Sequence, residues 1–599
     1  MSANPKKRTK SGCITCRIRR VKCDETKPDC KRCIEGKRKC DGYTPDGPAA
    51  TLSRRELAVV VRSLPTIGPA ARVLAGPQTP HNSVCWDFFR LRTAPTAGAF
   101  FPTGFWTTRL LQVAHTEPAV WSAVLALGAL HRRWELGAGG PEYHDDRVAQ
   151  FSKQAALCYG EALSKGKSIT DPETLLVLSL ALAAAANLKG EWAHSRVHIA
   201  SGQNILRNMG KKCTMPRLNS TREAFLRLDL QAMTLSESCT PYPFSSQGAG
   251  GPLDWPEGIM GGPVIPPNHI NSSSSLKATT GGIDSLAKGI LHLLHLLRRA
   301  LRVWGASVEM SLEQLATHEA DMLADLVAWE GDMAAYMSTG QHAAMIAKSP
   351  DSRAALLSLK LYHACTRLLF KANPAAGPAS LWDDCLAHFE RLVAISAALI
   401  PLTPTSTPGP VATFMSLEPG LVIPLYFVVS QCRHPAVRRT AARLLRRTHR
   451  QEGVWTSNGA AAVGEAIIKA EEEGLGLPRV ALPNKLLDEW ADEVANESWR
   501  YWLGGEENWT PKLTWDGPRV PSNQRVVDTD PRVDFESGTV GVTMKFFDIE
   551  LFDPATGAGM RTLHQVVDIG GVRNRAGSED IDGFWEAQDG QQQQQLEAE

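Results

Sequence analysis

Six cysteines crowd into a short N-terminal segment with the spacing Cys13-x2-Cys16-x6-Cys23-x6-Cys30-x2-Cys33-x6-Cys40. The unit Cys-x2-Cys-x6-Cys occurs twice, with the second copy starting seventeen residues after the first. Such repetition predicts two equivalent groups of metal-binding thiolates. Seven further cysteines are scattered, and we expect them to be buried thiols that pack as small apolar residues: Cys85, Cys158, Cys213, Cys239, Cys365, Cys385 and Cys432.

The number of thiolates indicates how many metal ions they hold. A structural zinc ion takes four ligands in a tetrahedron, so two ions need eight ligand positions. Six thiolates fill eight positions if two of them bind both ions, and one bridging sulfur from each half keeps the symmetry. The segment Met1–Arg8 is polar and lacks the apolar stretch of a signal peptide. We therefore expect a reducing compartment, in which clustered cysteines bind metal more often than they form disulfides.

Three other interpretations account less well for the cysteines. A single metal ion held by Cys13, Cys16, Cys30 and Cys33 leaves two cysteines unused at matching positions. A disulfide-linked secreted domain conflicts with the expected compartment. Chance surface cysteines do not account for a repeat in which three positions coincide.

Positive charge is concentrated in the same segment. Residues 1–40 contain fourteen Lys or Arg and four acidic residues, whereas the whole chain has a net charge of +2. This asymmetry predicts a small polyanion-binding head on a mildly acidic body. Within the segment 17–22, Ile18 and Val21 share one face of a short helix, which leaves four cations for solvent or DNA. Such a helix fits a major groove, where Arg or Lys can donate to guanine.

Residues 11–43, SGCITCRIRRVKCDETKPDCKRCIEGKRKCDGY, resemble the binuclear zinc cluster of fungal Zn(II)2Cys6 transcription factors. The resemblance implies two zinc ions (Zn²⁺) per chain, bridged by Cys13 and Cys30. One ion would be held by Cys13, Cys16, Cys23 and Cys30. The other would be held by Cys30, Cys33, Cys40 and Cys13.

The resemblance also implies how the head contacts double-stranded DNA. The side chain that contacts the bases would be Arg20, with Arg19 close by. The family usually has a lysine as its base-contacting residue, whereas this chain has an arginine. The remaining cations would contact the phosphate backbone: Arg17, Lys22, Lys31 and Arg32. The family typically recognises CGG-type triplets, often in pairs. Upstream, a basic run typical of a nuclear localisation signal or a phosphate-contacting arm predicts a nuclear protein; it comprises Lys6, Lys7, Arg8 and Lys10.

The sequence therefore predicts a small Zn2Cys6 domain, with two short helices around two zinc ions, joined to a large, mainly α-helical regulatory domain, with disordered termini. Its expected divisions are a basic arm (1–10), the zinc domain (11–43), a linker (44–80), the helical domain (81–503), a mixed segment (504–580) and a Gln-rich tail (581–599). A short apolar run in the linker has helical spacing, at Leu57, Val60 and Leu64, but Pro65 ends it. This run is shorter than the three or four heptads of a coiled coil, so it leaves the formation of a homodimer open.

The region 81–503 has helical periodicity and resembles the regulatory domain that follows the cluster in many fungal regulators, most clearly at 118–134, 188–206 and 424–455. Helices are predicted at 119–134, 147–165, 191–209, 222–237, 284–305, 311–337, 353–371, 380–399, 420–431, 435–450 and 459–474, and in the apolar stretch that Asp171-Pro172-Glu173 opens. Farther on, Val540, Val542 and Met544 alternate with small or polar residues, which allows a short strand. A nearby acidic group, interrupted by Pro531, is expected to lie in a solvated loop; it comprises Asp528, Asp530 and Asp534.

No catalytic motif is present. The run Gly160–Ser168 resembles a phosphate-binding loop but has the wrong glycine spacing and follows a helical pattern. His292 and His295 fit ordinary helix residues. The apolar run Leu175–Ala186 is shorter than the roughly 20 residues that span a bilayer, so no membrane partner is expected. We expect a DNA-binding transcription factor that contacts the transcription machinery or co-regulators. The alternatives are a zinc module for RNA or protein and an enzyme with a zinc appendage.

Overall fold

The structure is a computed structural model. It describes residues 13, 15–16, 21, 23–27, 30–36, 40, 80–101, 104–137, 146–210, 215–235, 283–306, 312–339, 346, 349–371, 380–403, 413–504, 508–534, 539–547 and 560–568. The chain divides into two compact units, Met1–Arg72, called the head below, and Val73–Glu599, called the body. The predicted linker and the Leu57–Leu64 run lie outside the described residues, except for Pro80, where the first helix of the body begins.

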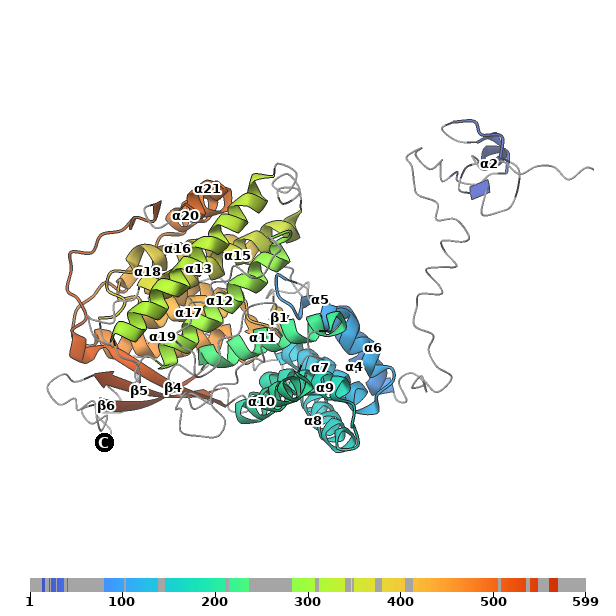
Figure 1. Ribbon diagram of the computed structural model, residues 1–599, viewed down its shortest axis with the longest axis horizontal. Coiled ribbons are helices and arrows are strands. Elements are labelled where there is room, and N and C mark those ends of the chain that lie inside the picture. The colour runs from blue at the N-terminus through green and yellow to red at the C-terminus, as the bar shows by residue number, and fades with distance from the viewer. Residues whose placement is uncertain are drawn as a thin grey trace, which may run out of the picture. The chain divides into compact units, whose positions relative to one another are not determined.

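Helices dominate the body, as predicted (Figure 1). The longer ones are α4 (Pro80–Phe88), α7 (Pro118–Gly137), α8 (Asp146–Gly166), α9 (Pro172–Lys189), α10 (Trp192–Met209), α11 (Asn219–Leu235), α12 (Leu286–Ala306), α13 (Leu312–Ser338), α15 (Pro350–Lys371), α16 (Leu386–Leu399), α17 (Val422–Gln431), α18 (Pro435–Thr448), α19 (Ser457–Glu472) and α20 (Asn484–Asn496). Shorter helical segments are α5 (Ala94–Thr96), α6 (Leu110–Ala114), α21 (Trp499–Trp502), η1 (Phe89–Thr93), η2 (Phe105–Arg109), η4 (Pro216–Leu218), η8 (Ile400–Leu402) and η10 (Ser522–Gln524).

Helix α9 illustrates why the sequence folds in this way. The Asp171 side chain accepts a hydrogen bond from the Thr174 amide, at 2.9 Å, and Pro172 occupies the first turn. Gly190 ends the helix with a φ of 77°, which glycine adopts without strain. The helix is long and apolar enough to cross a membrane, but 67% of it is buried in the body. We interpret it as a core helix.

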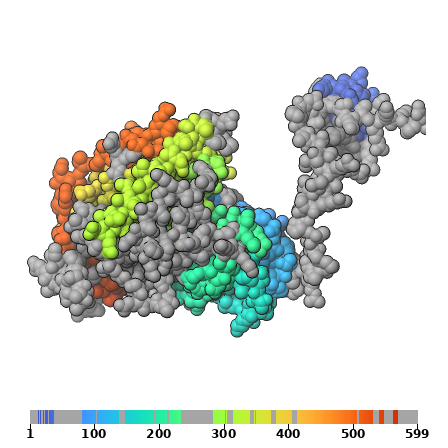
Figure 2. All heavy atoms as spheres, in the orientation of Figure 1, coloured from blue at the N-terminus to red at the C-terminus, as the bar shows by residue number. Residues whose placement is uncertain are grey.

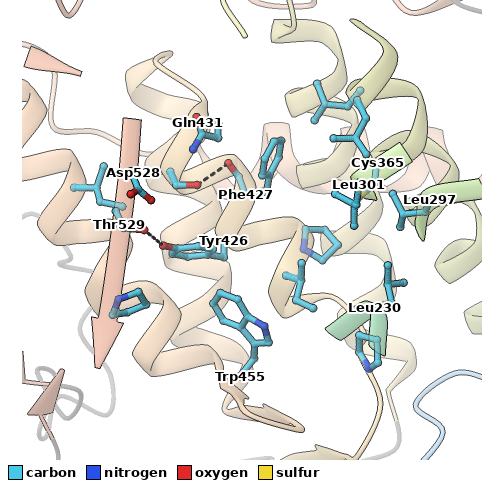
Figure 3. A pocket seen from close by; sticks show the side chains of 18 of the residues that line it. Leu230, Leu297, Leu301, Cys365, Tyr426, Phe427, Gln431, Trp455, Asp528 and Thr529 are labelled. Carbon is cyan, nitrogen blue, oxygen red and sulfur yellow. Dashed lines mark hydrogen bonds between the residues drawn. The ribbon is translucent and has the colours of Figure 1, made fainter. Parts of the chain in front are cut away.

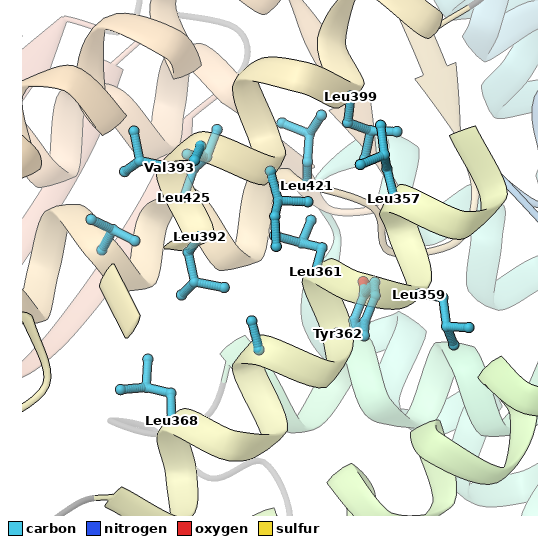
Figure 4. Close-up of a cluster of buried hydrophobic side chains, with 14 of the residues drawn as sticks. Leu357, Leu359, Leu361, Tyr362, Leu368, Leu392, Val393, Leu399, Leu421 and Leu425 are labelled. Atoms are coloured by element: carbon cyan, nitrogen blue, oxygen red, sulfur yellow. The ribbon is translucent and has the colours of Figure 1, made fainter. Parts of the chain in front are cut away.

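The body has two large hydrophobic cores. The first lies among α4 to α11 and contains Trp106, Leu127 and Phe225, all fully buried. The second lies among α11 to α21, and Figure 4 shows how α15, α16 and α17 contribute its leucines. Glu418 joins elements of the two cores, because its carboxylate accepts hydrogen bonds from the Trp106 indole at 2.7 Å and the Arg227 guanidinium at 3.1 Å.

At the surface of the body, α13 forms a continuous ridge (Figure 2). Its outward side carries two apolar side chains, Leu323 at 39% exposure and Val327 at 53%. Isolated exposed apolar residues of this kind are ordinary on a protein surface.

A small sheet inside the helical region was not predicted. Strand β1 (Phe414–Ser416) pairs in parallel with β2 (Arg450–Glu452), which pairs antiparallel with β3 (Trp455–Thr456). The helix predicted over 435–450 therefore ends early, at Thr448. It ends because His449 adopts a left-handed φ of 36°, which turns the chain into β2.

The C-terminal sheet is an antiparallel meander of β4 (Val526–Asp534), β5 (Thr539–Phe547) and β6 (Met560–Asp568). The strand predicted at Val540, Val542 and Met544 is confirmed as β5, and all three side chains pack against α19. The assignment of the acidic group to a loop is wrong, because it lies in β4: Asp528, Asp530 and Asp534. Pro531 is tolerated there since β4 is an edge strand.

Other expectations for the body are met within the described residues. Four of the scattered cysteines are buried, and Cys365 is partly buried, whereas Cys213 and Cys239 lie outside the described residues. The run Gly160–Ser168 belongs to the end of α8 and the turn after it. His295 is half-buried on α12, where desolvation lowers its pKa to about 3.

Candidate metal centre and nucleic-acid interface

The cysteines of the head converge because each Cys-x2-Cys unit brackets the start of a helical turn. In the second half, Cys30 immediately precedes α2 (Lys31–Glu35), and Cys33 lies one turn further on. The Cys33 amide donates to the Cys30 carbonyl at 3.0 Å, which closes this turn. Two thiols therefore emerge on one side of a short helix that is too small to be stable alone.

All six sulfur atoms gather in one place. The Cys13 sulfur lies 3.6 Å from that of Cys30 and 3.9 Å from that of Cys33. The Cys16 sulfur lies 3.6 Å from that of Cys30. These separations match the edge of a zinc–thiolate tetrahedron, which is about 3.8 Å for Zn–S bonds of about 2.3 Å.

The sulfurs form two overlapping groups of four, each within 4.8 Å. The first group is Cys13, Cys16, Cys23 and Cys30. The second group is Cys13, Cys30, Cys33 and Cys40. The groups share Cys13 and Cys30, the two residues for which the resemblance implies bridging. A single ion bound by four ligands would leave Cys23 and Cys40 unused beside it, so the geometry fits two metal ions.

The chemistry of the donors fits zinc. Six soft thiolates and no carboxylate or imidazole suit Zn²⁺ rather than a harder cation. Five of the cysteines are buried and Cys40 is partly exposed. Burial raises the pKa of the Cys13 thiol to about 12, and it raises those of Cys16 and Cys30 as well. Metal must therefore displace protons from these thiols, and zinc affinity will increase with pH.

Backbone amides support the charge of the bound thiolates. The Cys13 amide points to the Cys23 sulfur, the Cys16 amide to the Cys13 sulfur and the Glu25 amide to the Cys23 sulfur, each at 3.4 Å. Six thiolates with two zinc ions carry a net charge of −2, which such N–H donors stabilise.

Sequence reasoning missed Asp24, which fastens the two halves of the cluster together. Its carboxylate, next to Cys23, accepts hydrogen bonds from the backbone amides of Lys31 and Arg32, each at 3.0 Å, at the start of α2. A hydrogen bond from the Thr26 hydroxyl, followed by that from Arg32, holds the pKa of Asp24 well below its usual range. The signal in the sequence is weak, because the capping residue lies seven positions before the helix rather than next to it.

The structure places only part of the predicted DNA-contacting set. Lys31 and Arg32 lie on α2 and are exposed. The other predicted contacts, at Arg17, Arg19, Arg20 and Lys22, lie outside the described residues, and so do the four residues of the predicted localisation signal.

Two known families match the chain. Residues 11–47 match the fungal Zn(2)-Cys(6) binuclear cluster domain, and residues 87–504 match the fungal specific transcription factor domain. The chain belongs to the fungal Zn2Cys6 transcription factor family. The six converging cysteines are therefore its binuclear zinc centre, with two zinc ions, and residues 87–504 of the body are its fungal specific transcription factor domain, which is mainly helical.

Two curated relatives are similar in sequence to part of the chain. The chain is 26% identical over 228 residues to the aspercryptin biosynthesis cluster-specific transcription regulator atnN of Emericella nidulans, a match that covers 34% of this chain and 36% of that protein. It is 35% identical over 190 residues to an uncharacterized transcriptional regulatory protein of Schizosaccharomyces pombe, which covers 29% of this chain and 30% of that protein. The matches thus span about a third of each relative. No solved structure matches the chain significantly.

Proposed function

We propose that this protein is a sequence-specific, DNA-binding transcription factor that regulates genes transcribed by RNA polymerase II. The observation that carries the proposal is the convergence of six thiols into two groups that share Cys13 and Cys30, with a basic segment between Cys16 and Cys23. Zinc would fold the head and present that segment to DNA. Membership of a family of fungal transcription factors supports the same conclusion.

In this proposal Cys13 and Cys30 bridge the two ions, and Arg20 reads guanine in a CGG-type triplet, with Arg19 beside it. An arginine can donate two hydrogen bonds to the O6 and N7 atoms of guanine. Four other cations would contact phosphates and set the register of the head on the duplex: Arg17, Lys22, Lys31 and Arg32. The exposure of Lys31 and Arg32, and the fixing of their backbone amides by Asp24, support this role.

We further propose a role for each of the other segments of the chain. Residues 1–10 would act as a basic arm and direct the protein to the nucleus through Lys6, Lys7, Arg8 and Lys10. Residues 11–43 would form the DNA-binding domain, 44–80 the linker, and 81–503 the domain that contacts co-regulators or the transcription machinery. Residues 504–580 would complete the body, and 581–599 would be the disordered tail. Homodimer formation would pair two CGG half-sites.

The regulated genes are proposed to be metabolic genes of one pathway. The relative in Emericella nidulans is a regulator specific to one biosynthesis cluster. Its similarity to this chain favours a protein that likewise regulates the genes of a single pathway.

Fluorescence anisotropy with the full chain tests the proposal. The zinc-loaded protein should bind a CGG-containing duplex more tightly than a shuffled duplex of the same composition, by on the order of a thousandfold. Chelation should abolish this preference, and added zinc should restore it. Equal binding to both duplexes, or tighter binding to a single-stranded RNA of the same sequence, would instead favour a zinc module with another partner.

A further inference from the structure

The body contains a cavity of about 130 Å³ between its second hydrophobic core and the C-terminal sheet (Figure 3). Helices α11, α12, α15, α17 and α19 supply part of its wall, and strands β3 and β4 supply the rest. Strand β4 lies beyond residues 87–504, the region that matches the regulatory domain of the family. One part of the cavity lining thus belongs to the region that matches the family, and the other part, from β4, lies outside that region.

One end of the cavity is apolar. Leu230, Leu297 and Leu301 line it together with Cys365, and Figure 3 shows these side chains on one side of the space. Burial raises the pKa of the Cys365 thiol to about 12, so this group is neutral at physiological pH. A ligand would therefore meet a hydrocarbon surface here.

Two aromatic rings lie between the ends of the cavity. The rings of Tyr426 and Trp455 have their centroids 4.9 Å apart, tilted by 47°. The Tyr426 hydroxyl lies 3.3 Å from that of Thr529, so its polar end is already engaged. Both rings line the cavity, and a flat apolar group packs well against such a pair.

The opposite end is polar. Ser430 and Gln431, in the last turn of α17, line it together with Asp528 and Thr529 of β4. The Ser430 hydroxyl donates to the Phe427 carbonyl at 3.2 Å, so its oxygen is left to accept a hydrogen bond. Figure 3 shows Gln431, Asp528 and Thr529 on the side opposite the leucines. The Asp528 carboxylate accepts a hydrogen bond from Lys545 at 2.7 Å, so its charge is compensated from outside the cavity.

The charges around the cavity select the ligand. Among the described residues that line it, none is a lysine, arginine or histidine. A carboxylate or phosphate at the polar end would therefore lie beside the negative charge of Asp528, with no cation in the lining to offset that repulsion, which disfavours an anion. A cationic ligand would have to compete with Lys545 for the same carboxylate.

We propose that this cavity binds a small uncharged molecule, with an apolar ring between the leucines and the Tyr426–Trp455 pair and a hydroxyl or amide group at Ser430, Gln431 and Asp528. The volume sets the size, since an apolar cavity of about 150 Å³ accommodates benzene. The ligand, or the part of it that is enclosed, is thus about as large as one ring. The proposal does not depend on DNA recognition by the head.

Three probes of one shape test this ligand class. Benzyl alcohol, benzoate and benzylamine share a ring and differ in the charge of one substituent. Calorimetric titration of the full zinc-loaded chain should give saturable binding of benzyl alcohol and binding of benzoate at least roughly tenfold weaker. Benzylamine should bind no more tightly than the alcohol. The proposal would be overturned if benzyl alcohol showed no saturable binding. It would also be overturned if benzoate or benzylamine bound more tightly than benzyl alcohol.

Substitutions locate the site. Leu301→Phe should fill the apolar end and weaken benzyl alcohol at least roughly tenfold, whereas Leu323→Phe, on the exposed side of α13, should leave binding unchanged. Asp528→Asn should narrow the difference in affinity between benzoate and benzyl alcohol, because it removes the negative charge nearest the benzoate carboxylate while the positive charge of Lys545 stays. If Leu301→Phe fails to fold, the affinities of Asp528→Asn for benzoate and benzyl alcohol still test whether the ligand binds in this cavity. An unchanged ratio of the two affinities there would contradict the proposed polar end.

Discussion

The carboxylate of Asp24 accepts a hydrogen bond from the backbone amide of Arg32 at 3.0 Å. This contact connects the first cysteine unit of the head to the helix of the second, independently of the metal. It also orients the first turn of α2, from which the Lys31 and Arg32 side chains extend into solvent. The start of the helix that carries Lys31 and Arg32 is thus fixed by a residue outside the two groups of cysteines.

Replacing Asp24 with alanine should loosen the two halves of the cluster. The amides of Lys31 and Arg32 lose their acceptor, so the start of α2 frays and the zinc-bound form is less stable. A chelator should then remove zinc at a lower concentration than from the natural protein. Glu35→Ala, at the exposed end of the same helix, is the matched control and should leave the chelator midpoint in place.

Cys13 and Cys40 should differ in their effect on zinc content. Cys13 belongs to both groups of four sulfurs, whereas Cys40 belongs to one. Cys13→Ala should therefore weaken the binding of both ions. Cys40→Ala should weaken only the ion held by its own group and leave the other ion bound more tightly. Native mass spectrometry counts the ions directly. Cys158→Ala, a buried thiol of the body, should keep both, and identical losses from the two head variants would contradict shared ligation by Cys13.

Arg20 and Lys22 should have separate roles in DNA binding. Arg20→Ala should cost about 1–3 kcal/mol on the preferred duplex and relax the choice of base, because a base contact is lost. Lys22→Ala should weaken all duplexes alike and reduce the slope of log affinity against log salt by about one. Titrations of two duplexes at several salt concentrations distinguish these effects. An unchanged sequence preference in Arg20→Ala would assign the base contact to another residue.

The body should lose stability in mild acid through His388. The ring is buried against Trp509, with centroids 4.9 Å apart, and neither ring nitrogen has a hydrogen-bond partner in the described part of the chain. Burial, and then the nearby charges of Lys371, Arg391 and Arg367, lower its pKa to about 3. Below pH 6.5 the unfolded chain therefore binds a proton that the folded chain does not.

Stability should accordingly fall with pH in the window between the two pKa values. The contribution of His388 is about 1.4 kcal/mol per pH unit between roughly pH 6 and pH 4. Denaturant unfolding followed by tryptophan fluorescence measures the free energy of unfolding at each pH. Between pH 6 and pH 4 this free energy should fall less steeply in His388→Phe than in the natural protein. His194→Phe, at an exposed histidine, should keep the slope of the natural protein.

The metal centre was predictable because its six cysteines repeat one spacing within a short segment, and the bridging roles of Cys13 and Cys30 were implied by the family resemblance. Six cysteines in two copies of one pattern leave few ways to satisfy tetrahedral ligands, and the sulfurs indeed converge. The helices were predictable where capping and periodicity agree, as at Asp171 and Gly190 of α9. These features depend on residues that are close together in the sequence.

Features built from distant residues were missed. The strands β1 and β2 are three residues each and pair across α17 and α18, so they show no periodicity of their own. Strand β4 contains three aspartates and a proline, which favour a loop, yet its backbone pairs with β5 and is bulged near Asp528. The cavity draws its wall from helices and strands throughout the body, so no local pattern could indicate it.

The most direct test of the account is selection of binding sites from random duplex DNA by the full chain, with zinc counted per chain in the same preparation. The account predicts two zinc ions bound by the head and an enriched motif containing CGG, whose spacing would distinguish a monomer from a dimer. One zinc ion in the head, or no enriched sequence, would contradict it and indicate a mononuclear module whose partner is not a specific DNA site.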